Sequence, residues 1–203
     1  ELSKKFNTTG FDINEGRVSD LLNGKDTTLE ISKKILKETY LKFTNDVNDI
    51  SNCDIYIITV PTPVDKNNNP NFSPLESATK TVSQILSKKN IVIYESTVYP
   101  GATEEICVPI LEKNSGLKYN HDFFCGYSPE RINPGDNDHT LKNITKLVAG
   151  SNELCTDIIC ELYGSIITAG THKVSSIAIA EAAKVIENVQ RDVNIALINE
   201  LAM

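Results

Sequence analysis

Ile55-Tyr-Ile-Ile-Thr-Val60 and Ile91-Val-Ile-Tyr94 are the two stretches that decide the fold of this chain. Both are short and nearly continuous in apolar or β-forming residues, as expected of strands that are covered on both faces. Similar runs lie before and after them, and helical patterns separate the runs. Strands that alternate with helices at this spacing predict βαβ units and a mostly parallel sheet.

The elements expected from these patterns fill most of the chain. The strands are Thr9–Ile13, Leu41–Phe43, Asp54–Val60, Asn90–Glu95, Phe123–Tyr127, Lys146–Gly150 and Ser165–Ala169. The helices are Asn14–Leu22, Ile31–Tyr40, Pro74–Lys88, Ala102–Lys113, Glu153–Tyr163 and one long helix from Lys173 to the end. The fold class is therefore α/β, with a Rossmann-like doubly wound sheet. Ligands of such sheets bind at the carboxyl ends of the strands, so the segments that leave those ends are the candidate site.

The composition narrows the class of protein. The 203 residues carry a net charge of −7, which argues against a nucleic-acid partner. No apolar run approaches the ~20 residues needed to cross a membrane, so we expect no membrane partner. The five cysteines are scattered, with no CxxC pair and no metal-like clustering with the histidines. This pattern indicates reduced thiols, no metal site and a cytoplasmic protein.

Asp12 closes the first expected strand and is a candidate for cofactor binding. An acidic residue that ends a strand of a dinucleotide fold accepts hydrogen bonds from the ribose hydroxyls of adenosine. Arg17, five residues further on, could reach a phosphate or the adenine. Asp12 could equally be the N-cap of the helix that follows, which would need no cofactor.

Two further turns leave strand ends. In Val60-Pro-Thr-Pro63 the prolines stiffen the turn and leave Thr62 as a fixed polar group, although a plain loop could look the same. In Glu95-Ser-Thr-Val-Tyr-Pro-Gly101, Thr97 is placed to orient a water, a sugar hydroxyl or a phosphate. Alternatively, Ser96 or Thr103 simply caps the next helix.

The segment Gly126-Tyr-Ser-Pro-Glu-Arg-Ile-Asn-Pro-Gly135 is rigid and polar, with a carboxylate, a guanidinium and an amide at a strand end. Such a segment can hold a general base or orient a water, and Glu130 is the candidate. Arg131 could instead pair with Glu130 without any ligand.

The long C-terminal helix carries one polar ridge. Glu181, Lys184, Asn188 and Arg191 fall three or four residues apart, whereas most other positions are apolar. A helix that is apolar over most of its circumference is usually buried, and buried polar groups need partners. A bound anionic or polar substrate could supply them, and a ridge of internal salt bridges is the alternative.

These segments together resemble the UDP-glucose/GDP-mannose dehydrogenase family of nucleotide-sugar 6-dehydrogenases. The resemblance is carried in order along the chain by Gly10-Phe-Asp-Ile-Asn14, Val60-Pro-Thr-Pro63, Glu95-Ser-Thr-Val98, Ser128-Pro-Glu-Arg131 and Glu181-x-x-Lys184-x-x-x-Asn188. Two longer stretches most resemble the branch that acts on UDP-N-acetylhexosamines: Tyr94-Glu-Ser-Thr-Val-Tyr-Pro-Gly101 and Gly126-Tyr-Ser-Pro-Glu-Arg-Ile-Asn-Pro-Gly-Asp136. The resemblance implies two successive oxidations of the sugar C6 alcohol to the acid, with NAD as the cofactor, for surface polysaccharide synthesis.

The resemblance also implies roles for individual residues. The cofactor-binding residues would be Asp12 and Arg17 at the adenosine half, and Val60, Thr62, Ser96 and Thr97 towards the nicotinamide side. The catalytic residues would be Thr97, Glu130, Lys184 and Asn188, with Lys184 stabilising an oxyanion and Asn188 beside it. The substrate-binding residues would be Glu130, Arg131, Asn133, Lys184, Asn188 and Arg191.

The chain departs from the family pattern in two segments. The glycine-rich phosphate loop and the nucleophilic cysteine of the family are absent from it, so the resemblance implies a fragment that is inactive alone. We expect residues 1–172 to form the NAD-binding domain. Residues 173–203 would form a linking helix about 45 Å long that begins an all-helical central domain and pairs two copies as a homodimer. The alternatives are a two-electron dehydrogenase of the 6-phosphogluconate or hydroxyacid type, and a non-catalytic dimerisation or binding module.

Overall fold

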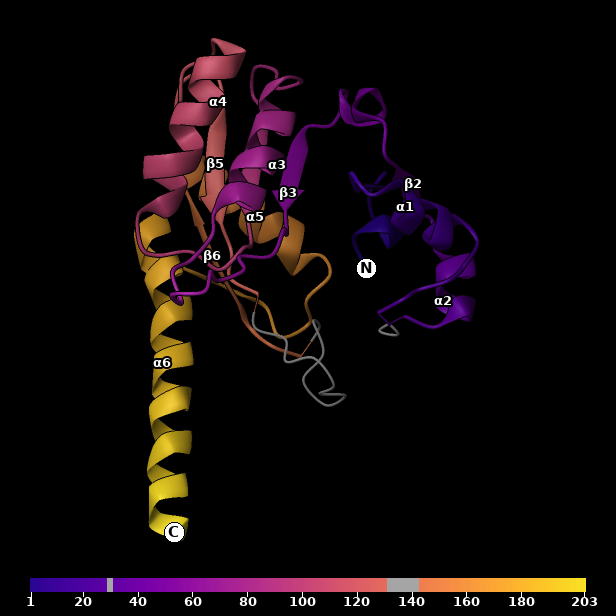
Figure 1. The fold of residues 1–203 in the computed structure, drawn as a ribbon. Coiled ribbons are helices and arrows are strands. Elements are labelled where there is room, and N and C mark those ends of the chain that lie inside the picture. The colour runs from indigo at the N-terminus through magenta and orange to yellow at the C-terminus, as the bar shows by residue number, and fades with distance from the viewer. Residues whose placement is uncertain (29–30, 131–142) are drawn as a thin grey trace. The chain divides into compact units, whose positions relative to one another are not determined.

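A computed structural model describes residues 1–28, 31–130 and 143–203, and the chain forms two compact units, Glu1–Cys53 and Asp54–Met203 (Figure 1). The first unit holds η1 (Leu2–Lys4), β1 (Thr9–Phe11), α1 (Glu15–Leu22), α2 (Lys33–Glu38), β2 (Lys42–Thr44) and η2 (Val47–Ile50). β1 and β2 pair in parallel, with Gly10 opposite Phe43. Asn14 caps α1 and Ser32 caps α2, each by accepting a hydrogen bond from a backbone N–H of the first turn.

The second unit is built on a five-stranded sheet. Its strands are β3 (Ile55–Ile58), β4 (Ile91–Tyr94), β5 (Phe124–Tyr127), β6 (Lys146–Gly150) and β7 (Thr171–Lys173), in that spatial order. Its helices are α3 (Ser73–Ser83), the π-helical turn η3 (Thr103–Cys107), α4 (Val108–Ser115), α5 (Glu153–Gly164) and α6 (Ile177–Ala202). Of the four strand pairs described in this sheet, β5–β6 is antiparallel and the other three are parallel. The fold is thus α/β and Rossmann-like with a mostly parallel sheet, as the sequence predicts.

The core of this unit lies on β4 and its neighbours. All four residues of β4 are buried, and Val92, Ile93 and Tyr94 are completely so. α3 packs on β3 and α4, and α5 packs on β5, β6 and β7. Burial on both faces explains why Ile91-Val-Ile-Tyr94 has no polar alternation.

The expected strand Ser165–Ala169 is wrong. Ile166 and Ile167 are buried, but their N–H groups both donate to the carbonyl of Tyr163, so the segment continues from α5 as a turn. Gly170 then takes a φ of +82°, and the edge strand β7 begins at Thr171. An apolar run of this length is compatible with a strand or with a covered turn, and periodicity alone does not separate them.

The long helix also differs from expectation. α6 begins at Ile177, where Ser176 accepts a hydrogen bond from the N–H of Ile179, rather than at Lys173. Its 26 residues span about 39 Å at ~1.5 Å per residue. Only Ile177, Ala180 and Glu181 are buried, so the expectation that the helix is buried fails for most of its length within this chain. The sheet strands that α6 contacts, β5 and β6, reach only its first turns.

The exposed part of α6 is rich in large apolar side chains. These are Ile186, Val189, Val193, Ile195, Leu197, Ile198 and Leu201, each more than half exposed. Figure 1 shows the helix extending away from the sheet. Among the described residues, none of the helices combines the length and the apolar character that a membrane crossing requires.

Candidate functional site

The carboxyl ends of three parallel strands meet at one edge of the sheet. Ile58 lies opposite Tyr94, and Tyr94 lies opposite Tyr127. The segments that follow these residues therefore leave the sheet side by side. They contain Val60 and Thr62, Ser96 and Thr97, and Ser128 to Glu130.

Hydrogen bonds tie the first two of these segments together. The Ser96 hydroxyl donates to the carbonyl of Val60 at 2.7 Å, and the Thr62 hydroxyl donates to the carbonyl of Thr97 at 2.7 Å. The carbonyl of Ser96 in turn accepts from the buried Tyr127 hydroxyl at 2.9 Å. The turns are thus fixed to each other while the Thr97 side chain stays exposed. Since Ser96 bonds across to Val60, it is not the cap of the following helix.

The cap of that helix comes from α6. The carboxylate of Glu181 accepts from the N–H of Gly101 at 2.5 Å, from the N–H of Thr103 at 2.9 Å and from the Thr103 hydroxyl at 2.6 Å. Glu181 is completely buried, and this burial raises the pKa of its carboxyl although the hydrogen bonds from Thr103 and Gly101 oppose the rise. The alternative that Thr103 itself caps the helix is therefore wrong, because its hydroxyl serves Glu181.

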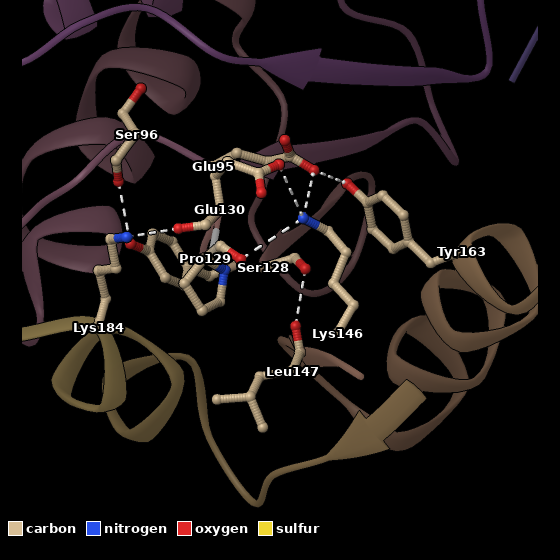
Figure 2. Close-up of polar contacts among 10 residues, drawn as sticks. Glu95, Ser96, Ser128, Pro129, Glu130, Lys146, Leu147, Tyr163 and Lys184 are labelled. Carbon is tan, nitrogen blue, oxygen red and sulfur yellow. Dashed lines mark hydrogen bonds and ion pairs between the residues drawn. The ribbon is translucent and has the colours of Figure 1, made fainter. Parts of the chain in front are cut away.

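Lys184, one turn further along α6, meets the segment after β5. Its Nζ donates to the backbone carbonyl of Glu130 at 2.5 Å, and the side chain is half-buried (Figure 2). Glu130 Oε2 lies 3.7 Å from Nζ of another lysine, Lys146. Glu130 therefore contacts one ammonium through its backbone and another through its side chain.

Lys146 and its neighbours were not identified from the sequence. Its ammonium lies 3.2 Å from Oε1 of Glu95, and that same oxygen accepts from the Tyr163 hydroxyl at 2.5 Å. A signal was present, because a lysine heads the otherwise apolar strand Lys146-Leu-Val-Ala-Gly150. Charged residues are rarely buried unless they are paired, so a lysine in such a strand indicates a buried partner.

The remaining predicted residues of the ridge are more exposed. Asn188 and Arg191 lie on the exposed part of α6, and Arg191 Nη2 is 3.6 Å from Oε1 of Glu187. The ridge thus passes from a buried carboxylate at Glu181, through half-buried Lys184, to solvent. Arg131 and Asn133 lie outside the described residues.

In the first unit, Asp12 is exposed directly after β1. Its Oδ1 accepts from the N–H of Asn14 at 2.8 Å, and Asn14 caps α1, so the reading of Asp12 as the helix N-cap is wrong. Arg17 is held by Oδ1 of Asp26 at 2.8 Å and by the Thr27 hydroxyl at 2.8 Å. Burial of Asp26 opposes its ionisation, but hydrogen bonds from Thr28, Ile31 and Arg17 hold the pKa of its carboxyl well below the usual range.

Comparisons with known proteins agree with these features. Residues 2–167 match the UDP-glucose/GDP-mannose dehydrogenase family, NAD binding domain. The chain belongs to this family. It is 56% identical to a UDP-N-acetyl-D-glucosamine 6-dehydrogenase of Pseudomonas aeruginosa and 53% identical to one of Salmonella typhi, in each case over 100% of this chain and 48% of the relative. A solved structure of the UDP-D-ManNAc dehydrogenase of Pyrococcus horikoshii superimposes with a TM-score of 0.89 at 32% identity, over 98% of this chain and 48% of that one.

The family makes NAD the cofactor of this domain, and the chain spans about half the length of the relatives it matches. The residues present suit such a dinucleotide. The exposed carboxylate of Asp12 at a strand end is an acceptor for ribose hydroxyls. The turns after β3 and β4 offer hydroxyl groups at the carboxyl edge of a parallel sheet, where nucleotides bind in this fold class.

Proposed function

We propose that the whole protein oxidises the C6 alcohol of a UDP-N-acetylhexosamine, such as UDP-N-acetylglucosamine or UDP-N-acetylgalactosamine, to the uronic acid. The observation that carries the proposal is the ammonium of Lys184 beside Glu130, next to the turns that hold Thr62 and Thr97. The names of the relatives at 53–56% identity support the choice of sugar.

The reaction takes two steps. Oxidation of a primary alcohol to an acid removes four electrons and takes up one water, so NAD, when bound, would have to supply a hydride acceptor twice. In the first step the alcohol loses its proton as it becomes an aldehyde, and in the second the hydrated or enzyme-bound aldehyde becomes the acid. Both steps place negative charge on the oxygen attached to C6.

Lys184 has the properties needed to stabilise that oxygen. An ammonium carries three donors, so the group that is anchored on the Glu130 carbonyl can also donate to an oxyanion. Asn188 follows one turn later on the same side of α6 and would be its hydrogen-bonding neighbour in the active site. The carboxylate of Glu130 would take up a proton and, with Thr97, position the water.

The other assignments are part of the same proposal. Asp12 and Arg17 would bind the adenosine half of NAD, and Val60, Thr62, Ser96 and Thr97 its nicotinamide side. Arg131, Asn133 and Arg191 would join Glu130, Lys184 and Asn188 in binding the sugar nucleotide. The uronic acid would serve surface polysaccharide synthesis, in the cytoplasm.

The proposal includes the division of the chain expected from its sequence. Residues 1–172 would form the NAD-binding domain, and residues 173–203 would begin a central domain and pair two copies. Because the chain spans only 48% of relatives that carry the activity in their names, we expect the 203 residues alone to be inactive.

The test follows NADH formation by the whole protein with UDP-N-acetylglucosamine, UDP-N-acetylgalactosamine and UDP-glucose. Lys184→Ala should lower kcat by roughly 100- to 1000-fold, the usual loss when one oxyanion donor is removed. Lys88→Ala is the matched control, since Lys88 pairs with Asp122 on the surface and should leave kcat unchanged. Full activity of the Lys184→Ala protein would contradict the assigned role, and inactivity of the wild type with all three sugars would contradict the proposed function.

A further inference from the structure

Lys146 contacts the carboxylate of Glu130 and has no role in the function proposed above. Its side chain is only 5% exposed, so it cannot meet a substrate directly. Its ammonium lies 3.2 Å from Oε1 of Glu95 and 3.7 Å from Oε2 of Glu130. Figure 2 shows the three side chains pointing toward one another. Burying an ammonium costs free energy of desolvation unless opposite charges and hydrogen bonds surround it.

The antiparallel strand explains how Lys146 reaches the site. β6 runs against β5, with Gly126 opposite Gly150 and Tyr127 opposite Ala149. The first residue of β6 therefore lies at the carboxyl edge of the parallel strands, and continuing the register brings Lys146 opposite Glu130. A parallel β6 would have placed its first residue at the other edge of the sheet.

Two lysines hold two consecutive carbonyl groups. Lys146 Nζ donates to the carbonyl of Pro129 at 3.5 Å, and Lys184 Nζ donates to the carbonyl of Glu130 at 2.5 Å. The first lysine comes from β6 and the second from α6. Each of the two carbonyl groups of the short segment Pro129–Glu130 thus accepts a hydrogen bond from a lysine.

Lys146 is itself held in place by residues of β4 and α5. Oε1 of Glu95, from the end of β4, contacts the ammonium, and the Tyr163 ring of α5 lies 5.0 Å from it. Burial and the neighbouring Glu95 carboxylate raise the pKa of Tyr163 well above its ordinary value, so its hydroxyl stays a donor to Glu95. Within residues 1–28, 31–130 and 143–203, the charged and titratable side chains found in contact with Lys146 are Glu95, Glu130 and Tyr163.

We propose that Lys146 is a positioning residue of the reaction, which fixes Glu130 and, through the Glu130 carbonyl, the ammonium of Lys184. The inference rests on the proposed function, because Glu130 and Lys184 are its catalytic groups. The antiparallel pairing of β5 with β6 would thus serve to bring the buried Lys146 to the edge of the sheet where Glu130 lies. Lys146 acts through these groups and not on the substrate.

A double-mutant cycle in the whole protein tests this role. Lys146→Met should lower kcat by roughly 10- to 100-fold, as small misplacements of catalytic groups do, with the KM for NAD nearly unchanged. In the Glu130→Gln background, where the group it positions is already lost, Lys146→Met should lower kcat little further. An equal loss in both backgrounds, or no loss from Lys146→Met alone, would mean that Lys146 only stabilises the fold and would overturn the inference.

Two further variants keep the test decisive. Lys173→Met is the matched control, because this lysine of β7 pairs with Asp157 at the surface and should leave kcat unchanged. If the Lys146→Met protein does not fold, Glu95→Gln takes its place in the cycle, since it loosens Lys146 without removing it. It should lower kcat several-fold only where Glu130 is present, and an equal loss in both backgrounds or no loss contradicts the role.

A crystal structure of the whole Lys146→Met protein gives a reading that needs no activity. The Glu130 carbonyl should leave Nζ of Lys184, and a retained contact overturns the inference. If the wild type reduces no NAD with any UDP-sugar, the proposed function fails, while this structure still decides whether Lys146 positions the segment.

Discussion

Glu181 joins α6 to the turn after β4 through a single buried carboxylate. It accepts three hydrogen bonds from Gly101 and Thr103, and Lys184 follows it by one helical turn. The spacing between the Thr97 turn and Lys184 therefore depends on this contact. In the motif Glu181-x-x-Lys184, Glu181 fixes α6 to the turn after β4 and thereby positions Lys184.

We expect Glu181→Gln to destabilise the whole protein by about 1–3 kcal/mol, because an amide nitrogen cannot accept a hydrogen bond, whereas both oxygens of the carboxyl can accept in its charged and protonated forms. The raised pKa of Glu181 means that its contribution to stability is largest below the ordinary value of 4.5 and falls as pH rises through the folded-state pKa. The gap in the free energy of unfolding between wild type and variant should therefore narrow from acidic towards neutral pH. Urea unfolding at several pH values measures it, and a gap that widens with pH would contradict the assignment.

The sequence predicted some side chains of the candidate site and missed others. Thr62, Thr97, Glu130 and Lys184 were predicted because each follows a strand end or falls on a polar ridge, and Ser96 was added by the family resemblance. The structure gathers all five in the second unit. Lys146, Glu95 and Tyr163 come together only through sheet pairing and the packing of α5, which local patterns do not encode. Local patterns equally could not predict that Glu181 caps a helix through Thr103, 78 residues away in the sequence.

At the scale of elements, α5 packs closely against the sheet at a glycine. A Cβ on Gly150, the last residue of β6, would lie 2.5 Å from the backbone nitrogen of Thr156 and 2.8 Å from the carbonyl carbon of Cys155. Backbone atoms cannot move aside without shifting α5. The close approach of helix to strand therefore requires glycine at this position.

We expect Gly150→Ala to lower the free energy of unfolding by about 1–3 kcal/mol or more, as overpacking does. Gly164→Ala at the end of α5 is the control, since an added Cβ meets nothing within 4 Å and should be neutral or slightly stabilising. Thermal unfolding of both proteins compares them. Equal melting temperatures would show that α5 does not lie as close to β6 as described.

The sequence predicted an element correctly where the burial of its residues and its helix cap agree with the hydrophobic periodicity. β3, β4, β5 and β6 lie within their predicted ranges because each is a short apolar run between turn residues. The error at Ser165–Ala169 arose because Ile166 and Ile167 are buried in a turn. α6 begins at Ile177 rather than at Lys173 because Ser176 caps it. The absence of glycine and proline, on which the predicted start was based, does not locate such a cap.

At the scale of the whole molecule, the exposed apolar residues of α6 support the proposed homodimer. Residues such as Val193 and Leu197 are more than half exposed on one long helix, and apolar patches of this kind mark association surfaces. Pairing with a second copy would cover them. The apolar pattern was visible in the sequence, but the expectation of burial holds only if a partner supplies the cover.

Light scattering on the whole protein should give the mass of a dimer. The double variant Val193→Glu and Leu197→Glu should shift it towards the monomer, because it places charges in the apolar surface. Asn194→Glu, a charge added at a polar position of the same helix, serves as the control. A monomeric wild type would remove the homodimer from the account.

The measurement that tests the central claim most directly is the number of NADH formed per UDP-N-acetylglucosamine consumed by the whole protein. A four-electron oxidation to the uronic acid predicts two NADH for each sugar, with no aldehyde left in solution. One NADH per sugar would contradict the account and point to a two-electron dehydrogenase. No NADH would leave a family fold whose lysine and glutamate serve another purpose.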